Sequence, residues 1–132
     1  MTYFQMRFYK IFESVVIFWD VGGAKSIRPY WENYYENTHV LLYFFDASDR
    51  KKVDESVEAF SEIFENDHIK ENVPVIVVGN KSDLPEFSPD FGKFESNKTG
   101  KKIHTLPCSA LDLDSVKNVA DKIFEYTYPN AI

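Results

Sequence analysis

The sequence has one cysteine, Cys108, and no apolar run that reaches the about 18 residues of a membrane-spanning helix. A lone thiol cannot close a disulfide within the chain, which excludes a disulfide-stabilised secreted scaffold and favours a reducing, cytoplasmic compartment. Basic residues are also few, because 15 Lys and Arg stand against 21 Asp and Glu, for a net charge of −6. We therefore expect neither nucleic acid nor an anionic membrane as a partner.

Lipidation motifs are missing as well. The start, MTYFQ, lacks the glycine that myristoylation requires, and the end, YPNAI, lacks a cysteine for prenylation. No direct membrane anchor is expected in this chain, so a location at an endomembrane would have to come through partners.

The residues that are present predict one globular domain over residues 1–132, since 44% are hydrophobic and 17% are aromatic. Two β-branched and aromatic runs, YFQMRFYKIF and VVIFWDV, predict an antiparallel hairpin. The runs HVLLYFFDAS and VPVIVVGN are almost wholly apolar, which predicts strands buried on both faces of a parallel sheet. KKIHTLPC predicts a weaker fifth strand.

Two helical stripes alternate with these strands. One stripe consists of Val53, Val57, Phe60 and Phe64, and the other consists of Val116, Val119, Ala120, Ile123 and Phe124. Their spacing predicts two helices that face the core. Residues 84–102 are polar and turn-rich, so at most a short helix is expected there. The alternation predicts an α/β fold that binds ligands at the carboxyl ends of its strands.

The segment after VPVIVVG carries the spacing N-K-x-D, which suits a guanine base. A carboxylate at Asp83 can accept from both the ring N–H and the exocyclic amine of guanine. Asn80 can tie neighbouring loops together, and the methylene stem of Lys81 can lie flat against the base. Ser109 and Ala110, after the next strand, are small enough to let backbone amides approach the guanine oxygen. Each segment, taken alone, is also typical of a polar turn.

The segment WDVGG ends an earlier strand and has the form D-x-x-G. Asp20 would hold Mg²⁺ through water, and the amide of Gly23 would reach a terminal phosphate with no Cβ in the way. A tight turn is the simpler interpretation of these residues in isolation. The guanine motif about 60 residues downstream favours the phosphate interpretation.

These residues resemble the small GTPases of the Ras-like superfamily, and most closely the ADP-ribosylation-factor and ADP-ribosylation-factor-like branch. WDVGG, IRPYW and YYENT match that branch's switch II and the helix after it, and DASDR and NKSDLP match further on. PCSALDLDSVKNVADKIF is typical of Ras-like proteins in general. The resemblance implies a three-layer P-loop NTPase fold, with a mostly parallel sheet and an antiparallel edge hairpin.

The resemblance also implies a GTP/GDP switch in membrane traffic or related signalling, with Mg²⁺ as cofactor. Its partners would be an exchange factor, an activating protein and effectors. Phe4, Trp19 and Tyr34 match the aromatic triad that family members expose to effectors. The helical spacing of Tyr30, Trp31, Tyr34 and Tyr35 is equally compatible with core packing.

Two features depart from the family pattern. The phosphate-binding loop G-x-x-x-x-G-K-[ST] and its strand are missing, which predicts an amino-terminally truncated chain whose neighbouring strands are left as sheet edges. Ala24 stands where the family carries the glutamine that orients the attacking water, so we expect poor hydrolysis and no catalytic residue. The alternative to a switch is a nucleotide-independent binding module, or a fragment, that uses the aromatic face.

Overall fold

The computed structural model describes residues 4–11, 14–65, 69, 72–96 and 103–127. The chain divides into two compact units, Met1–Asn37 and Thr38–Ile132, and each is described here by itself. The prediction of a single domain over the whole chain stays a prediction. No helix in the described ranges is both long and apolar enough to cross a bilayer.

The first unit is built on an antiparallel hairpin of β1 (Phe4–Ile11) and β2 (Ser14–Val21), as the sequence predicts. The residues that join the two strands lie outside the described ranges. A 3₁₀ helix, η1 (Arg28–Tyr34), follows β2 with Pro29 in its first turn. Proline suits that position because its fixed φ matches a helix start and its missing N–H would be unsatisfied there anyway.

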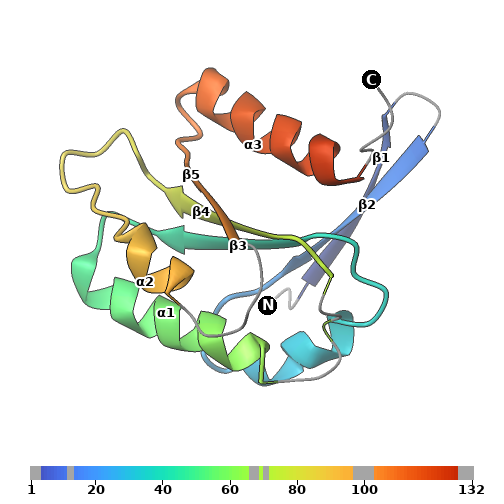
Figure 1. The fold of residues 1–132 in the computed structure, drawn as a ribbon, viewed down its shortest axis with the longest axis horizontal. Coiled ribbons are helices and arrows are strands. Elements are labelled where there is room, and N and C mark those ends of the chain that lie inside the picture. The colour runs from blue at the N-terminus through green and yellow to red at the C-terminus, as the bar shows by residue number, and fades with distance from the viewer. Residues whose placement is uncertain (1–3, 12–13, 66–68, 70–71, 97–102, 128–132) are drawn as a thin grey trace. The chain divides into compact units, whose positions relative to one another are not determined.

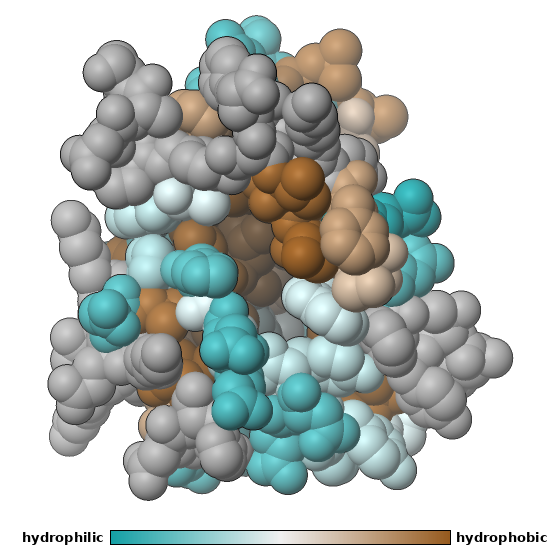
Figure 2. Space-filling model, turned by 90° about the vertical axis from the view of Figure 1, so that its right-hand side faces the viewer, coloured by the Kyte–Doolittle hydropathy of each residue, from teal (hydrophilic) through white to brown (hydrophobic). Residues whose placement is uncertain are grey.

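One face of this hairpin is apolar and exposed. The register places Met6 opposite Trp19 and Phe8 opposite Ile17, so these four residues share a face. Their exposed fractions lie between 43% and 59%, and Val15, two residues before Ile17, is 60% exposed. Figure 2 shows hydrophobic residues, in brown, on the face of the molecule that it draws.

The second unit has three layers around a parallel sheet in the order β3-β4-β5. Its strands are β3 (Leu41–Asp46), β4 (Val75–Asn80) and β5 (Ile103–Pro107). The helices α1 (Arg50–Ile63) and α2 (Phe91–Glu95) cover one face, and α3 (Leu113–Thr127) covers the other (Figure 1). Asp49 caps α1 by accepting from the backbone N–H of Lys51, which satisfies one of the free amides of the first turn.

The core of this unit surrounds β4, whose residues from Val75 to Val78 are fully buried. On the α1 side, the Phe94 ring packs against the rings of Phe45 and Phe60 at centroid distances of 4.6 and 5.4 Å. On the α3 side, Cys108 is buried with Val119. The predictions of a buried β4, a short helix within residues 84–102 and a fifth strand are therefore confirmed.

Two predictions about burial are wrong. Phe44 of β3 is 54% exposed, because β3 is the outer strand of its sheet and α3 packs over β4 and β5. Val116 is 40% exposed and Ala120 is exposed, because the face of α3 that meets the core follows Val119, Ile123 and Tyr126. At 100° per residue, Val116 and Ala120 lie about 60° and 100° from Val119 on the helix.

The backbone ladders of the described strands form two separate sheets. In these ladders β2 pairs with β1 and β3 pairs with β4, so both strands are edges. That VVIFWDV and HVLLYFFDAS become edges because a strand between them is missing stays a prediction.

Candidate functional site

The carboxyl ends of β3, β4 and β5 meet at one edge of the parallel sheet. Asp46 lies opposite Asn80, and Gly79 lies opposite Pro107. Backbone bonds continue this order into the loops, because Ser82 donates to the carbonyl of Cys108 at 3.0 Å and Cys108 donates to that of Gly79 at 2.9 Å. The N-K-x-D segment and the Ser109-Ala110 segment are thereby held side by side, as the sequence predicts for a ligand site at the strand ends.

Asp83 and Ser109 are joined by a chain of hydrogen bonds at this edge. The Ser109 hydroxyl donates to Oδ1 of Asp83 at 2.8 Å, and Ser109 itself is only 1% exposed. Ser115, in the first turn of α3, accepts from the Ser109 amide at 2.9 Å. A carboxylate has two acceptor oxygens, and this chain of bonds orients Asp83 through one of them. The arrangement fits a carboxylate that reads a pair of N–H donors on a base.

Lys81 combines an unusual backbone conformation with an ion pair of its side chain. Its backbone has a φ of 65°, a left-handed conformation that costs energy for a residue with a Cβ and that is common at functional sites. Its Nζ donates to Oδ2 of Asp46 at 2.8 Å. This bond from Lys81, with further bonds from Ser48, lowers the pKa of Asp46 from 3.8 to about 2, and the same contact raises the pKa of Lys81.

The sequence motifs assign no role to Asp46, although DASDR matches the family pattern. The signal that could have found it is its place at the end of a buried apolar run, one strand away from the N-K-x-D segment. Parallel strands end at the same edge, so an acid there falls within reach of Lys81.

The other base-site residues have simpler surroundings. Asn80 is half-buried, and its backbone carbonyl accepts from Ala47 at 3.3 Å, so at least the backbone ties two strand ends together. The loop-tying role of its side chain stays a prediction. Ala110 is exposed, and because the Ser109 amide already donates to Ser115, we expect the Ala110 amide to be the one that reaches a guanine oxygen.

The WDVGG segment belongs to the first unit. Asp20 is exposed at the end of β2, and the carbonyls of Gly22 and Gly23 accept from Trp31 Nε1 at 2.7 Å and Arg28 Nε at 3.0 Å. Among the described residues, a Cβ added at Gly23 would meet no atom within 4 Å. The backbone carbonyl of Ala24 accepts from Ile27 at 2.8 Å, and its methyl offers no hydrogen bond to a water.

The donor set for Mg²⁺ is small. Across the described ranges, no group of three or more His, Cys, Asp or Glu side chains comes together. Mg²⁺ prefers six oxygen ligands and commonly takes several of them from water and nucleotide phosphates. The single carboxylate of Asp20 does not fit a Mg²⁺ held by protein alone.

Two members of the predicted effector triad lie together within the first unit. The rings of Trp19 and Tyr34 are 5.7 Å apart at an interplanar angle of 43°, and Trp19 is 50% exposed. Tyr34 is half-buried. The backbone of Phe4 pairs with Val21, but the Phe4 side chain lies outside the described part of the structure.

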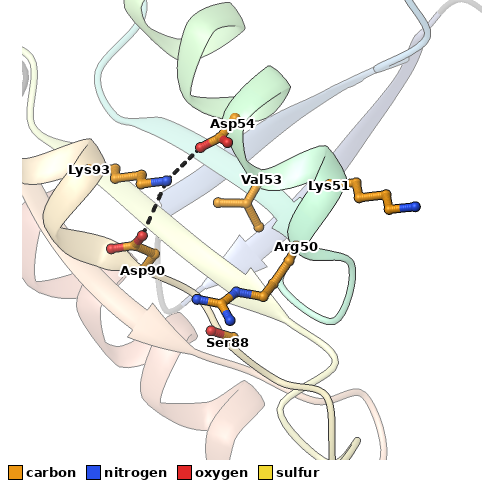
Figure 3. A pocket seen from close by; sticks show the side chains of 7 residues that line it. All are labelled: Arg50, Lys51, Val53, Asp54, Ser88, Asp90 and Lys93. Atoms are coloured by element: carbon orange, nitrogen blue, oxygen red, sulfur yellow. Dashed lines mark hydrogen bonds and ion pairs between the residues drawn. The ribbon is translucent and has the colours of Figure 1, made fainter.

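A pocket of about 380 Å³ lies between the start of α1 and the loop before α2 (Figure 3). Lys93 bridges Asp54 and Asp90 across it, at 2.6 and 3.4 Å, while Lys51 points away. None of the base-site residues lines this pocket, so it is not the guanine site.

Curated proteins resemble this chain in sequence. The curated "ADP-ribosylation factor-like protein 3" of Caenorhabditis elegans is 44% identical over 66 residues, which cover 50% of this chain and 35% of that protein. The protein of the same description in Saccharomyces cerevisiae is 30% identical over 115 residues, covering 83% of this chain and 58% of that one. The chain thus spans between about a third and three fifths of the relatives it matches.

A solved structure shares the fold. The Arl6 BBS3 small GTPase from Trypanosoma brucei, determined with the nucleotide analogue GppNp, aligns with a TM-score of 0.75 and 16% identity. The alignment covers 92% of this chain and 80% of that one, so the Ras-like fold class is confirmed. The model of the ADP-ribosylation factor family matches residues 3–127, and the chain therefore belongs to this family.

Proposed function

We propose that this chain is the guanine-reading and effector-facing part of an Arf-like GTP/GDP switch. The observation that carries the proposal is the hydrogen bond between Ser109 and Asp83, which presents a carboxylate at the strand ends next to Lys81. Family membership and the Ras-like fold support the same function.

The proposed division of roles follows the sequence motifs. Asp83 accepts from the base, the Lys81 stem flanks it, and the Ala110 amide donates to it. Asn80 supports the loops, and Gly23 offers its amide to a phosphate. Mg²⁺, when bound with the phosphates, would supply charge neutralisation beside Asp20.

Regulation and location remain parts of the proposal. We place the switch in membrane traffic or a related signalling process, in the cytoplasm and at endomembranes through partners. Exchange factors, activating proteins and effectors are the expected partner classes. Because Ala24 cannot orient a water, the proposed activity is binding and release of guanine nucleotide more than rapid hydrolysis.

The test is a calorimetric titration of the chain with GDP, XDP and ADP. We expect GDP to bind more tightly than ADP, and we expect Asp83→Asn to weaken GDP by about 100-fold or more while improving XDP. Two charge-assisted hydrogen bonds at about 1.5–3 kcal/mol each account for that loss.

Asp112→Asn is the matched control, because it removes the same charge from the neighbouring loop, between β5 and α3. Asp112 accepts from the amides of Asp114 and Ser115 at the start of α3, and asparagine can make those bonds too. Equal affinity of the unmodified chain for GDP and ADP would show that the guanine assignment is wrong.

A second candidate function is a nucleotide-independent binding module. The observation that favours it is the exposed apolar face of the hairpin, which includes Met6, Phe8, Ile17 and Trp19. The same titration separates the two functions, because a module of this kind would bind neither GDP nor ADP.

A further inference from the structure

We propose that Asp46 is a positioning residue for base binding, which holds the Lys81 side chain so that its methylene stem lies ready against the base. The inference rests on the proposed guanine binding and assigns a role to a residue outside the N-K-x-D segment. The ligand group that the Lys81 stem would contact is the face of a purine ring.

The first step is that the Asp46 carboxylate is itself fixed. Its Oδ1 accepts from the amide and the hydroxyl of Ser48, at 2.9 and 2.6 Å. Its Oδ2 accepts from Lys81 Nζ at 2.8 Å. With both oxygens engaged, Asp46 holds the lysine ammonium at a defined point of the strand-end edge.

The second step is that Lys81 spans two strands. Asp46 ends β3 and lies opposite Asn80 in the ladder, and Lys81 follows Asn80 directly. The Lys81 carbonyl accepts from the Leu84 amide at 3.1 Å, and the Lys81 ammonium is held across the ladder by Asp46. The four methylenes between these two points therefore lie along the edge where the loops of Asp83 and Ser109 emerge.

The third step is the consequence for binding. A free lysine side chain has many rotamers, and ordering them when a ligand binds weakens the affinity. An ion pair that orders the stem in advance reduces this loss, while the apolar methylenes remain able to contact a base. The Lys81 side chain is 51% exposed and that of Asp46 is 35% exposed, so the stem is accessible to a ligand and the effect is modest.

The experiment measures GDP affinity for Asp46→Asn, Lys81→Met and the double variant. We expect Asp46→Asn to weaken GDP binding roughly two- to fivefold, the range for an exposed ion pair. In the Lys81→Met background the same substitution should cause no further loss, because Asp46 acts through Lys81. Asp54→Asn is the control, since it removes an exposed ion pair with Lys93 away from the base site (Figure 3), and it should leave the affinity unchanged.

A second readout separates positioning from stability. When GDP is added, the Lys81 methylene protons should shift upfield in the NMR spectrum through the ring current of the base, and Asp46→Asn should reduce that shift. Unchanged affinity in Asp46→Asn, or an equal loss with and without Lys81, would overturn the inference while leaving guanine binding intact. If the unmodified chain does not prefer GDP to ADP, the proposed function is wrong and the role of Asp46 falls with it.

Discussion

The two compact units of this chain bury their apolar residues to very different extents. In the second unit the residues of β4 from Val75 to Val78 are fully buried between helices. Among the described side chains of the first unit, Ile27 is the one buried hydrophobic residue, at 3% exposed. Phe8 is 59% exposed and Trp19 is 50% exposed.

This difference separates two roles that one chain has to combine. A two-stranded hairpin is marginally stable by itself in water, so the first unit depends on contacts beyond its own ladder. Its exposed apolar face is suited to a partner. The second unit has a packed core, and it carries the hydrogen-bonded loops around Asp83 and Ser109. The packed unit is therefore the one that we expect to set the stability and the base preference.

The largest expected effect tests where the stability resides. Phe94→Ala removes a fully buried ring that packs against Phe45 and Phe60, and it should lower the free energy of unfolding by about 3–5 kcal/mol. Phe8→Ala removes a ring of the same size from the exposed hairpin face, and it should change the free energy by less than about 0.5 kcal/mol. Urea unfolding followed by far-UV circular dichroism measures both.

The same experiment tests whether the units unfold together. Both tryptophans, Trp19 and Trp31, lie in the first unit, whereas the α-helices lie in the second. Coincident transitions by tryptophan fluorescence and circular dichroism would support the single domain predicted from the sequence, because one cooperative transition gives one curve by every probe. An equal loss of stability from Phe8→Ala would contradict the contrast between the units.

A smaller loss of stability is expected from adding a methyl group at a closely packed glycine of the second unit. A Cβ at Gly79 would lie 3.1 Å from two ring carbons of Phe91 and 3.2 Å from Cβ of Pro89. Gly79→Ala should therefore destabilise the chain by about 1–3 kcal/mol, measured as a lower urea midpoint. Gly92→Ala is the matched control, since no atom of the described residues lies within 4 Å of the added Cβ and alanine favours the helix by up to about 1 kcal/mol. A Gly79→Ala chain as stable as the unmodified one would show that Phe91 moves aside freely.

The sequence predicts the elements of this fold well because their signals are local. The apolar run of β4, the period of α1 and the N-K-x-D spacing each lie within one short segment. Phe44 was predicted to be buried because an apolar strand looks the same at the centre and at the edge of a sheet. Its exposure depends on which strands flank β3, and that is a property of the whole fold.

The candidate site shows the same limit. Asp83, Ser109 and Lys81 were found from their motifs, and the structure brings their loops together. The bond from Lys81 to Asp46 joins residues 35 positions apart, and no spacing rule within one segment could have found it. The sequence pattern also does not predict that the helix at Arg28–Tyr34 is a 3₁₀ helix, because aromatic residues at helical spacing fit a 3₁₀ helix as well as an α-helix.

The smallest expected effect concerns the pH dependence of the Asp46 contact in the packed unit. Lys81 and Ser48 lower the pKa of Asp46 from 3.8 to about 2, so the folded chain favours the charged carboxylate more than the unfolded chain does. A depressed pKa of this kind adds stability above about pH 4, and this stability is lost as the pH falls towards about 2.

The unmodified chain should therefore be more stable than Asp46→Asn near neutral pH, and the difference in the free energy of unfolding should shrink between about pH 4 and about pH 2. Urea unfolding of both proteins across this range measures it. Both side chains are open to solvent, which keeps the difference small. A difference that stays constant over the whole range would show that the introduced amide perturbs the strand end by its shape and that the charge of Asp46 contributes nothing.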